Sequence, residues 1–139
     1  MIVYWDSSII LALALKEPHQ LGNWRTYETR VGSELVEVEC FRALDRIQLV
    51  GRSSQEELLK ARDRLFVLRS MLDVVPLDRG ILRRASDPFP LPVRTLDAIH
   101  LASAIAWREE NRAEIIFATH DKALAKAATA MGFQIVGIG

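Results

Sequence analysis

The chain has 139 residues, of which 50% are hydrophobic and 26% charged, with 7 Gly and 5 Pro. This length suits one domain, residues 1–139, with its own core, and the composition excludes disordered and low-complexity proteins. Basic and acidic side chains balance at 18 each, which excludes a protein that coats nucleic acid or anionic membrane by bulk charge. Cys40 is the single cysteine, which excludes an internal disulfide framework and fits a reducing, cytoplasmic setting.

The charge is distributed unevenly along the chain. Residues 1–41 carry a net charge of −3, residues 42–94 a net charge of +4, and the remainder −1. Of the 18 cations, 14 are Arg, the side chain that binds phosphate through paired hydrogen bonds. Most surface arginines merely solvate helix faces. The segment 42–94 is therefore a candidate phosphate-binding surface that needs other evidence.

No segment approaches the roughly 20 apolar residues of a membrane span. The apolar run 9–15 is preceded by Asp6 and by no basic residue, so we expect no targeting peptide and no membrane association.

Hydrophobic runs and capping residues predict alternating strands and helices. In chain order we expect a strand at 2–5, helices at 9–16 and 19–27, a weak strand at 29–31, helices at 33–49 and 55–72, an edge strand at 74–77, a helix at 79–86, a loop at 87–92, a helix at 95–110, a strand at 115–118, a helix at 122–131 and a strand at 133–136. This alternation predicts a three-layer α/β fold, with a central, mainly parallel sheet of four to five strands flanked by helices. Ligands of such sheets bind beyond the carboxyl ends of the strands.

Acidic side chains occur where these ligand-binding edges are expected. Asp6 directly follows the first strand, and Asp121 follows the strand at 115–118 by a short interval. Asp97 lies in the first turn of its helix, and Glu39 lies on a helical column with small and apolar residues. A carboxylate on such a column is unusual, because an unpaired buried charge is costly.

Each acid also has a purely structural explanation. Asp6 and Asp121 can act as helix N-caps, and Asp97 suits a helix N-terminus through the helix dipole. Glu39 can lie at a helix edge in solvent. On the same criteria we expect His100 to be a half-buried histidine with its hydrogen bonds satisfied, rather than a ligand.

The interpretation changes if the four acids meet. Two carboxylates about 5 Å apart repel by about 3 kcal/mol at an effective dielectric constant of 20. Six such pairs would oppose folding by as much as the whole stability of a typical domain, about 5–15 kcal/mol. A cluster of this kind needs protons or a cation, and hard oxygen ligands favour Mg²⁺ or Mn²⁺.

Four pieces of the chain, in order, resemble the PIN-domain family, and specifically the VapC-type ribonuclease toxins of type II toxin–antitoxin systems. The pieces are Ile2-Val3-Tyr4-Trp5-Asp6-Ser7-Ser8; Ser33-Glu34-Leu35 through Glu39-Cys40-Phe41-Arg42-Ala43-Leu44; Leu96-Asp97-Ala98-Ile99-His100-Leu101-Ala102-Ser103-Ala104; and Phe117-Ala118-Thr119-His120-Asp121. Together they span nearly the whole chain, and the segment 97–102 is the most specific. Trp5 departs from the pattern, because an aliphatic residue is usual there.

The resemblance implies that Asp6, Glu39, Asp97 and Asp121 are the catalytic, metal-binding quartet. Glu34 and Glu37 compete with Glu39, but the Arg42 and Leu44 that follow favour Glu39. Ser7 and Thr119 resemble the polar residues that support the metal site in the family.

The implied activity is Mg²⁺-dependent hydrolysis of RNA phosphodiester bonds, with Mn²⁺ as a substitute metal, leaving 5′-phosphate and 3′-hydroxyl ends. Arg42 and Arg94, the cations nearest the motifs, are candidates for holding the RNA backbone. The implied partners are RNA, a small cognate antitoxin and a second copy of the chain.

Two alternatives from other classes stay open. Asp78 after the third strand and Thr119 after the fourth mildly suggest a receiver-like module that accepts a phosphoryl group, although the N-terminal acidic doublet of such modules and their Lys after the last strand are missing. The other alternative is a catalytically silent PIN domain that only binds partners.

Overall fold

The computed structural model describes residues 1–138. Its elements, in chain order, are β1 (Ile2–Trp5), α1 (Ser7–Ala14), a short 3₁₀ helix (Trp24–Thr26), β2 (Thr29–Ser33), α2 (Leu35–Leu49), α3 (Gln55–Ser70), β3 (Asp73–Val75), α4 (Arg79–Ser86), α5 (Thr95–Asn111), β4 (Ile116–Ala118), α6 (Lys122–Ala130) and β5 (Gln134–Val136). The five strands form one sheet in the order β3-β2-β1-β4-β5, and every neighbouring pair is parallel. The expected α/β fold is confirmed.

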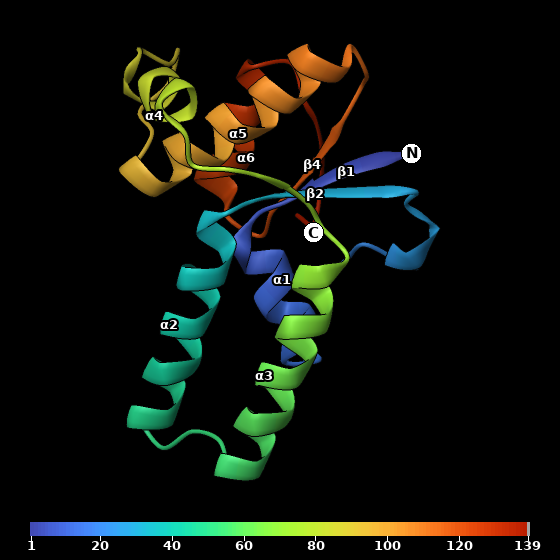
Figure 1. Ribbon diagram of the computed structural model, residues 1–139, viewed down its shortest axis with the longest axis vertical. Helices are drawn as coiled ribbons and strands as arrows, with labels where there is room; N and C mark the ends of the chain where they lie inside the picture. Colours follow the sequence, from blue (N-terminus) through green and yellow to red (C-terminus); the bar gives the residue numbers. More distant parts are fainter. Residues whose placement is uncertain (139) are drawn as a thin grey trace.

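The sheet is the middle of three layers (Figure 1). Helices α1, α2 and α3 lie on one face, with α2 and α3 forming a long hairpin that extends away from the sheet, while α4, α5 and α6 lie on the other side. None of the helices within residues 1–138 is long and apolar enough to cross a membrane.

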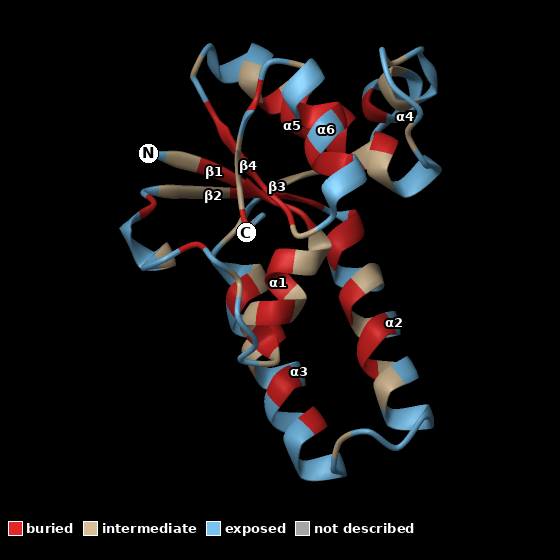
Figure 2. Ribbon diagram, turned by 180° about the vertical axis from the view of Figure 1, so that it is seen from behind, coloured by how far each residue is buried: buried red, intermediate tan, exposed pale blue. Residues whose placement is uncertain are grey.

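Side chains of β1 alternate between two hydrophobic cores, one on each face of the sheet. Val3 and Trp5 belong to the cluster under α1–α3, whereas Tyr4 belongs to the cluster under α5 and α6. All three are fully buried, as expected for a central parallel strand covered on both faces (Figure 2). Because side chains alternate, Asp6 follows on the same side as Tyr4, toward α5. The unusual Trp5 is accommodated edge-on against Trp24, with ring centroids 5.4 Å apart.

Two sequence-based expectations about local structure are wrong. The predicted helix at 19–27 is reduced to the 3₁₀ turn Trp24–Thr26, because Gly22 adopts a φ of +66° and Asn23 caps the short turn instead. Ser33 ends β2 rather than opening α2, although its hydroxyl still accepts a hydrogen bond from the N–H of Leu35. The strand is longer than predicted because both of its neighbours pair with it.

Candidate active site

Asp6 is a buried carboxylate at the carboxyl end of the central strand. It is 4% exposed and caps α1, with Oδ1 accepting from the N–H of Ile9 at 3.3 Å and from the hydroxyl of Ser8 at 2.6 Å. Oδ2 accepts from the hydroxyl of Thr119 at 2.6 Å. Burial raises the pKa of Asp6, against the opposing effects of His100 and of these donors. An ionised Asp6 therefore gains from any cation placed beside it.

Thr119 connects Asp6 to Asp121. Parallel pairing of β1 with β4 sets Trp5 beside Ala118, so the residues that follow both strands meet at one edge of the sheet. The fully buried Thr119 hydroxyl donates to Asp6 and accepts from the N–H of Asp121 at 3.0 Å. Asp121 itself is exposed, and its Oδ1 caps α6. Both acids that follow strands are thus N-caps, as their structural explanation predicted.

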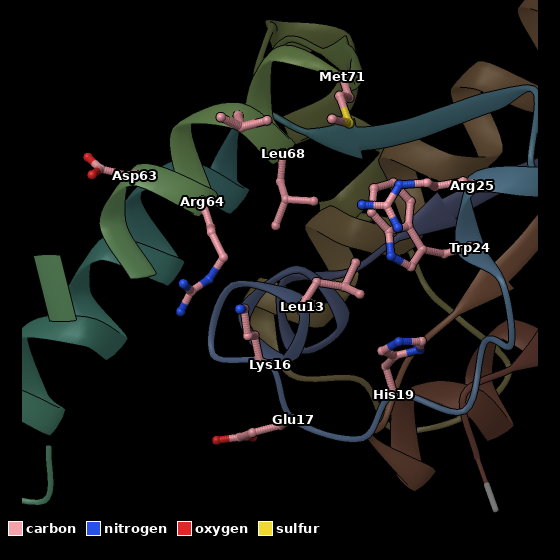
Figure 3. Close-up of a pocket in the computed structure, with 11 residues that line it drawn as sticks. Leu13, Lys16, Glu17, His19, Trp24, Arg25, Asp63, Arg64, Leu68 and Met71 are labelled. Atoms are coloured by element: carbon pink, nitrogen blue, oxygen red, sulfur yellow. The ribbon is translucent and has the colours of Figure 1, made fainter. Parts of the chain in front are cut away.

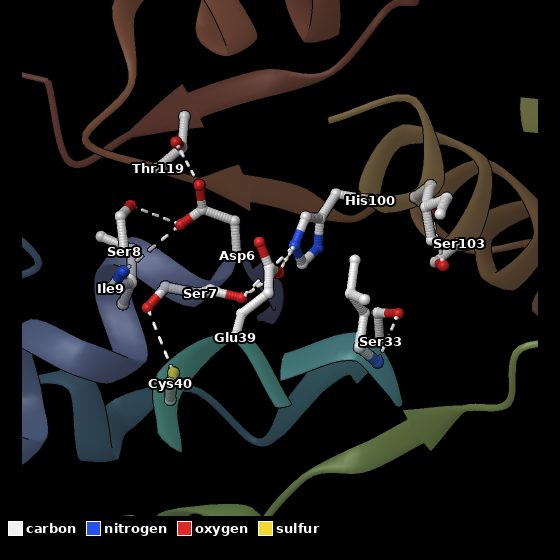
Figure 4. A network of polar contacts seen from close by, with 12 residues as sticks. Asp6, Ser7, Ser8, Ile9, Ser33, Glu39, Cys40, His100, Ser103 and Thr119 are labelled. Carbon is white, nitrogen blue, oxygen red and sulfur yellow. Dashed lines mark hydrogen bonds and ion pairs between the residues drawn. The ribbon is translucent and has the colours of Figure 1, made fainter. Parts of the chain in front are cut away.

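Glu39 reaches this edge from α2. Its Oε1 accepts from Nε2 of His100 at 2.6 Å and from the hydroxyl of Ser7 at 2.5 Å (Figure 4). Burial acts to raise the pKa of Glu39, but the hydrogen bond and charge of His100, together with Ser7, outweigh it and lower that pKa. The competing glutamates are engaged elsewhere, because Glu34 accepts from the N–H of Leu77 and Glu37 lies 3.7 Å from Arg69.

The pKa of Asp97 is affected by the charges of the other three acids. It lies half-buried in the first turn of α5. Burial raises the pKa of Asp97 most, followed by the charge of Asp121, and Asp6 and Glu39 add smaller effects in the same direction. His100 opposes them. The other three acids therefore all lie close enough to Asp97 for their charges to act on it.

A cavity of about 340 Å³ opens beside Asp97 and Asp121. Arg94, at the N-cap of α5, lines it, and its other walls are mostly apolar. Arg42 lies elsewhere, exposed on α2 and paired with Asp45 at 3.0 Å. Of the two candidate arginines, Arg94 is the one that shares a cavity with the acids.

The donor set fits a hard divalent cation. Its side chains offer carboxylate and hydroxyl oxygens, the ligands that Mg²⁺ and Mn²⁺ prefer, and burial disfavours an uncompensated negative charge at Asp6. Across residues 1–138, no group of three or more His, Cys, Asp or Glu side chains is arranged so that it could hold a metal ion. Asp121, in particular, directs Oδ1 to the backbone of α6.

Several neighbours of the acids were not foreseen as parts of the site. His100 is 2% exposed and touches Glu39, and Tyr4 lies behind it with its hydroxyl 2.6 Å from Nδ1. The signals were present: Tyr4 precedes Asp6 by two residues on one face of β1, and His100 follows Asp97 by one helical turn. Ser8 was also missed, although it contacts both Asp6 and the backbone N–H of His120.

A separate cavity of about 500 Å³ lies at the other end of α1 (Figure 3). Its walls come from α1, α3 and the 3₁₀ turn and include Leu13, Trp24, Arg64 and Leu68. None of the four acids lines it. This cavity is thus separate from the four acids.

The fold and the acidic edge define a class: parallel α/β domains that gather carboxylates from separate segments at the carboxyl end of the sheet. The chain belongs to the PIN-domain family, whose model (PIN domain) matches residues 3–130. Within that family it is of the VapC type, as its relatives indicate.

Two relatives from Mycobacterium tuberculosis are named ribonucleases. The chain is 36% identical to Ribonuclease VapC46 of strain ATCC 25618 / H37Rv over 106 residues, which cover 73% of this chain and 73% of the relative. It is 32% identical to Ribonuclease VapC47 of strain CDC 1551 / Oshkosh over 145 residues, covering 99% of this chain and 98% of the relative.

Proposed function

We propose that this protein is a Mg²⁺-dependent endoribonuclease and the toxin of a toxin–antitoxin pair. The observation that carries the proposal is that Asp121, Asp6 and Glu39 all lie close enough to Asp97 for their charges to act on it, in a chain whose relatives are named ribonucleases. Four carboxylates from separate segments are costly to bring together without a cation.

In this proposal, Asp6, Glu39, Asp97 and Asp121 hold the metal. Mg²⁺ or Mn²⁺, when bound, supplies Lewis-acid chemistry that activates water and stabilises negative charge on the phosphate. Thr119 and Ser8 hold Asp6 in position, and Ser7 holds Glu39, each through a hydroxyl that donates to the carboxylate. The products are RNA fragments with 5′-phosphate and 3′-hydroxyl ends.

Arg94 is the stronger candidate for holding the RNA backbone. It shares the cavity with Asp97 and Asp121, and none of the ion pairs found within residues 1–138 includes it. Arg42 is weaker because it lies outside this cavity, exposed on α2 and paired with Asp45. Arg94→Gln should weaken RNA binding and reduce the salt dependence of binding by about one phosphate contact. Unchanged affinity and an unchanged salt slope would remove Arg94 from this role.

The proposed activity is tested by incubating the purified protein with total RNA, with Mg²⁺ or with EDTA, and by mapping the ends of the fragments. Asp6→Asn removes the charge but keeps a residue that caps helices well, so it should fold and fail to cleave. Asp78→Asn is the matched control: Asp78 caps α4 in the same way, with Oδ1 accepting from the N–H of Ile81, but lies outside the acidic set. It should cleave like wild type.

The alternatives give other outcomes in this experiment. If wild type fails to cleave any RNA in Mg²⁺ or Mn²⁺, a silent interaction domain becomes the better interpretation. The receiver-like alternative has little structural support, because Asp78 follows the edge strand β3 instead of a central strand. Phosphorylation of Asp78 by a small phosphodonor would revive it.

The proposed partners beyond RNA are a small antitoxin and a second copy of the chain, in the cytoplasm. Large apolar side chains stay exposed on the α2–α3 hairpin, including Leu49, Leu59 and Phe66. Such exposure is typical of protein-binding surfaces. Size-exclusion chromatography with light scattering, alone and with the product of an adjoining small reading frame, tests both partners.

A further inference from the structure

A buried chain of hydrogen bonds leads from the core of the protein to Glu39. The hydroxyl of Tyr4 lies 2.6 Å from Nδ1 of His100, and Nε2 of His100 lies 2.6 Å from Oε1 of Glu39. Tyr4 is fully buried and His100 is 2% exposed. The three residues come from β1, α5 and α2, so the chain joins elements that are far apart in the sequence.

The direction of these hydrogen bonds follows from the chemistry of the groups. An ionised Glu39 can only accept hydrogen bonds, so the 2.6 Å contact requires a proton on Nε2 of His100. The phenol hydroxyl of Tyr4 lies 2.6 Å from Nδ1 and can donate to it. Tyr4 then fixes the ring with its N–H directed at Glu39.

The contact leaves one oxygen of Glu39 available. Ser7 and His100 both donate to Oε1, and within the described chain Oε2 makes no hydrogen bond. Figure 4 shows this second oxygen on the side of Glu39 that faces Asp6. A carboxylate on a long, flexible side chain is thus held with one oxygen anchored and the other directed at the acidic site.

We propose that His100, supported by Tyr4, is a positioning residue that orients Glu39 for binding of the divalent cation. The proposal rests on the proposed function, since it assumes that the acids bind a metal. In this proposal His100 acts on the metal site through Glu39 and does not itself ligate. Groups that orient a ligand from behind typically change metal affinity or activity by about 10–100-fold when they are removed.

Equilibrium binding of Mn²⁺, followed by electron paramagnetic resonance of the free ion, tests the proposal without any need for turnover. His100→Leu removes the donor and should raise the Kd for Mn²⁺ by about 10–100-fold. His100→Gln restores an N–H that reaches about as far as Nε2 and should recover most of the affinity. Tyr4→Phe keeps the ring and loses the hydroxyl, so it should weaken Mn²⁺ binding less than His100→Leu does.

Trp107→Phe is the control for a purely structural effect. Trp107 is also a buried aromatic side chain on α5, and its Nε1–H donates to Asp73 at 2.8 Å, away from the acidic site. Losing that bond should lower the melting temperature and leave the Kd for Mn²⁺ unchanged. If Trp107→Phe weakens Mn²⁺ binding as much as His100→Leu does, the effect comes from a general destabilisation of α5, and the proposal is overturned.

The remaining outcomes separate the two proposals. If wild type binds Mn²⁺ and His100→Leu binds it within about twofold, or if His100→Gln recovers nothing, the positioning role is wrong and the nuclease proposal is untouched. If wild type binds no Mn²⁺, both fall. Should His100→Leu fail to fold, Tyr4→Phe decides alone, and an unchanged Kd in that variant overturns the proposal.

Discussion

The carboxylate of Asp6 accepts three hydrogen bonds, from Ser8, Ile9 and Thr119, yet burial still raises its pKa. A buried carboxylate whose donors do not fully replace water destabilises the fold when it is charged. Catalytic residues often have shifted pKa values, because the burial that makes them reactive also destabilises their charged form. The burial of an ionised Asp6 therefore lowers the stability of the fold while serving the proposed function.

Asp6→Asn should therefore stabilise the protein in EDTA, increasingly so as pH rises. A raised pKa in the folded state means that the stability conferred by protonated Asp6 is present below the ordinary value near 4 and is lost as pH rises through the folded pKa. The advantage of Asn should grow over that window, with a slope of at most about 1.4 kcal/mol per pH unit. Urea unfolding of both proteins across the pH range measures it. If the difference in free energy of unfolding between Asp6→Asn and wild type stays constant or shrinks as pH rises, the raised pKa of Asp6 is wrong.

Cys40 should be chemically inert in the folded protein. Burial, with smaller contributions from the charges of Glu39 and Asp6, raises the pKa of its thiol to about 12. The thiolate is the reactive form, so modification by a disulfide reagent at pH 8 should be slower than in the denatured chain by about a thousandfold or more. A stopped-flow or spectrophotometric time course in the absence and presence of urea gives both rates. Equal rates would mean that the thiol is exposed.

At the scale of elements, the acidic site depends on how helices begin. Asp6 and Asp121 are the N-caps of α1 and α6, so the carboxylates that the proposed chemistry needs also fix where those helices start. One side chain that serves both purposes explains why either interpretation fits the sequence. Substitutions can separate the two roles.

Asp121→Asn and Asp121→Ala should differ in stability but not in function. Asn caps a helix about as well as Asp, whereas Ala leaves the N–H groups of Ala123 and Leu124 without their acceptor. We expect Asn to keep the free energy of unfolding and Ala to lose about 1 kcal/mol, while both lose Mn²⁺ affinity. Chemical denaturation and Mn²⁺ binding are the measurements. If Asn binds Mn²⁺ as well as wild type, Asp121 contributes a cap and nothing more.

The end of β5 closes against the strand end that carries Thr119. Gly137 has a φ of +96°, and a Cβ added there would lie 2.7 Å from the carbonyl oxygen of Thr119. Gly137→Ala should therefore destabilise through both backbone strain and collision. Gly22→Ala is the control, because Gly22 has a φ of +66° with open space around it and suffers strain alone.

Thermal or urea unfolding should give a larger loss for Gly137→Ala than for Gly22→Ala, by at least about 1 kcal/mol, with Gly22→Ala losing about 1–2 kcal/mol. Equal losses of unfolding free energy in the two variants would mean that β5 can move away from Thr119 without destabilising the fold.

At the scale of the whole molecule, the parts that were predictable are those governed by local chemistry. Periodicity and capping predict the buried strand Ile2–Trp5, helices close to Gln55–Ser70 and Arg79–Ser86, and the positions of Asp6 and Asp121 after strands. The spacing of Tyr4 from Asp6 and of His100 from Asp97 indicates that each lies near an acid. Their contact with each other spans 96 residues of sequence and depends on how α5 packs against the sheet, so spacing alone does not predict it. The sequence predicts a half-buried His100 with its hydrogen bonds satisfied. Its hydrogen bonds are satisfied, but the side chain is 2% exposed and one of its partners is one of the four acids.

The central claim is that Asp6, Glu39, Asp97 and Asp121 bind one or more divalent cations together. The most direct measurement is a crystal structure of the protein with Mn²⁺, with the anomalous signal of the metal used to locate it. The account predicts a peak bonded to Asp6 and to oxygens of at least two of the other three acids, with Oε2 of Glu39 among them. No peak at this edge at saturating Mn²⁺, or a peak held by other residues, would contradict it.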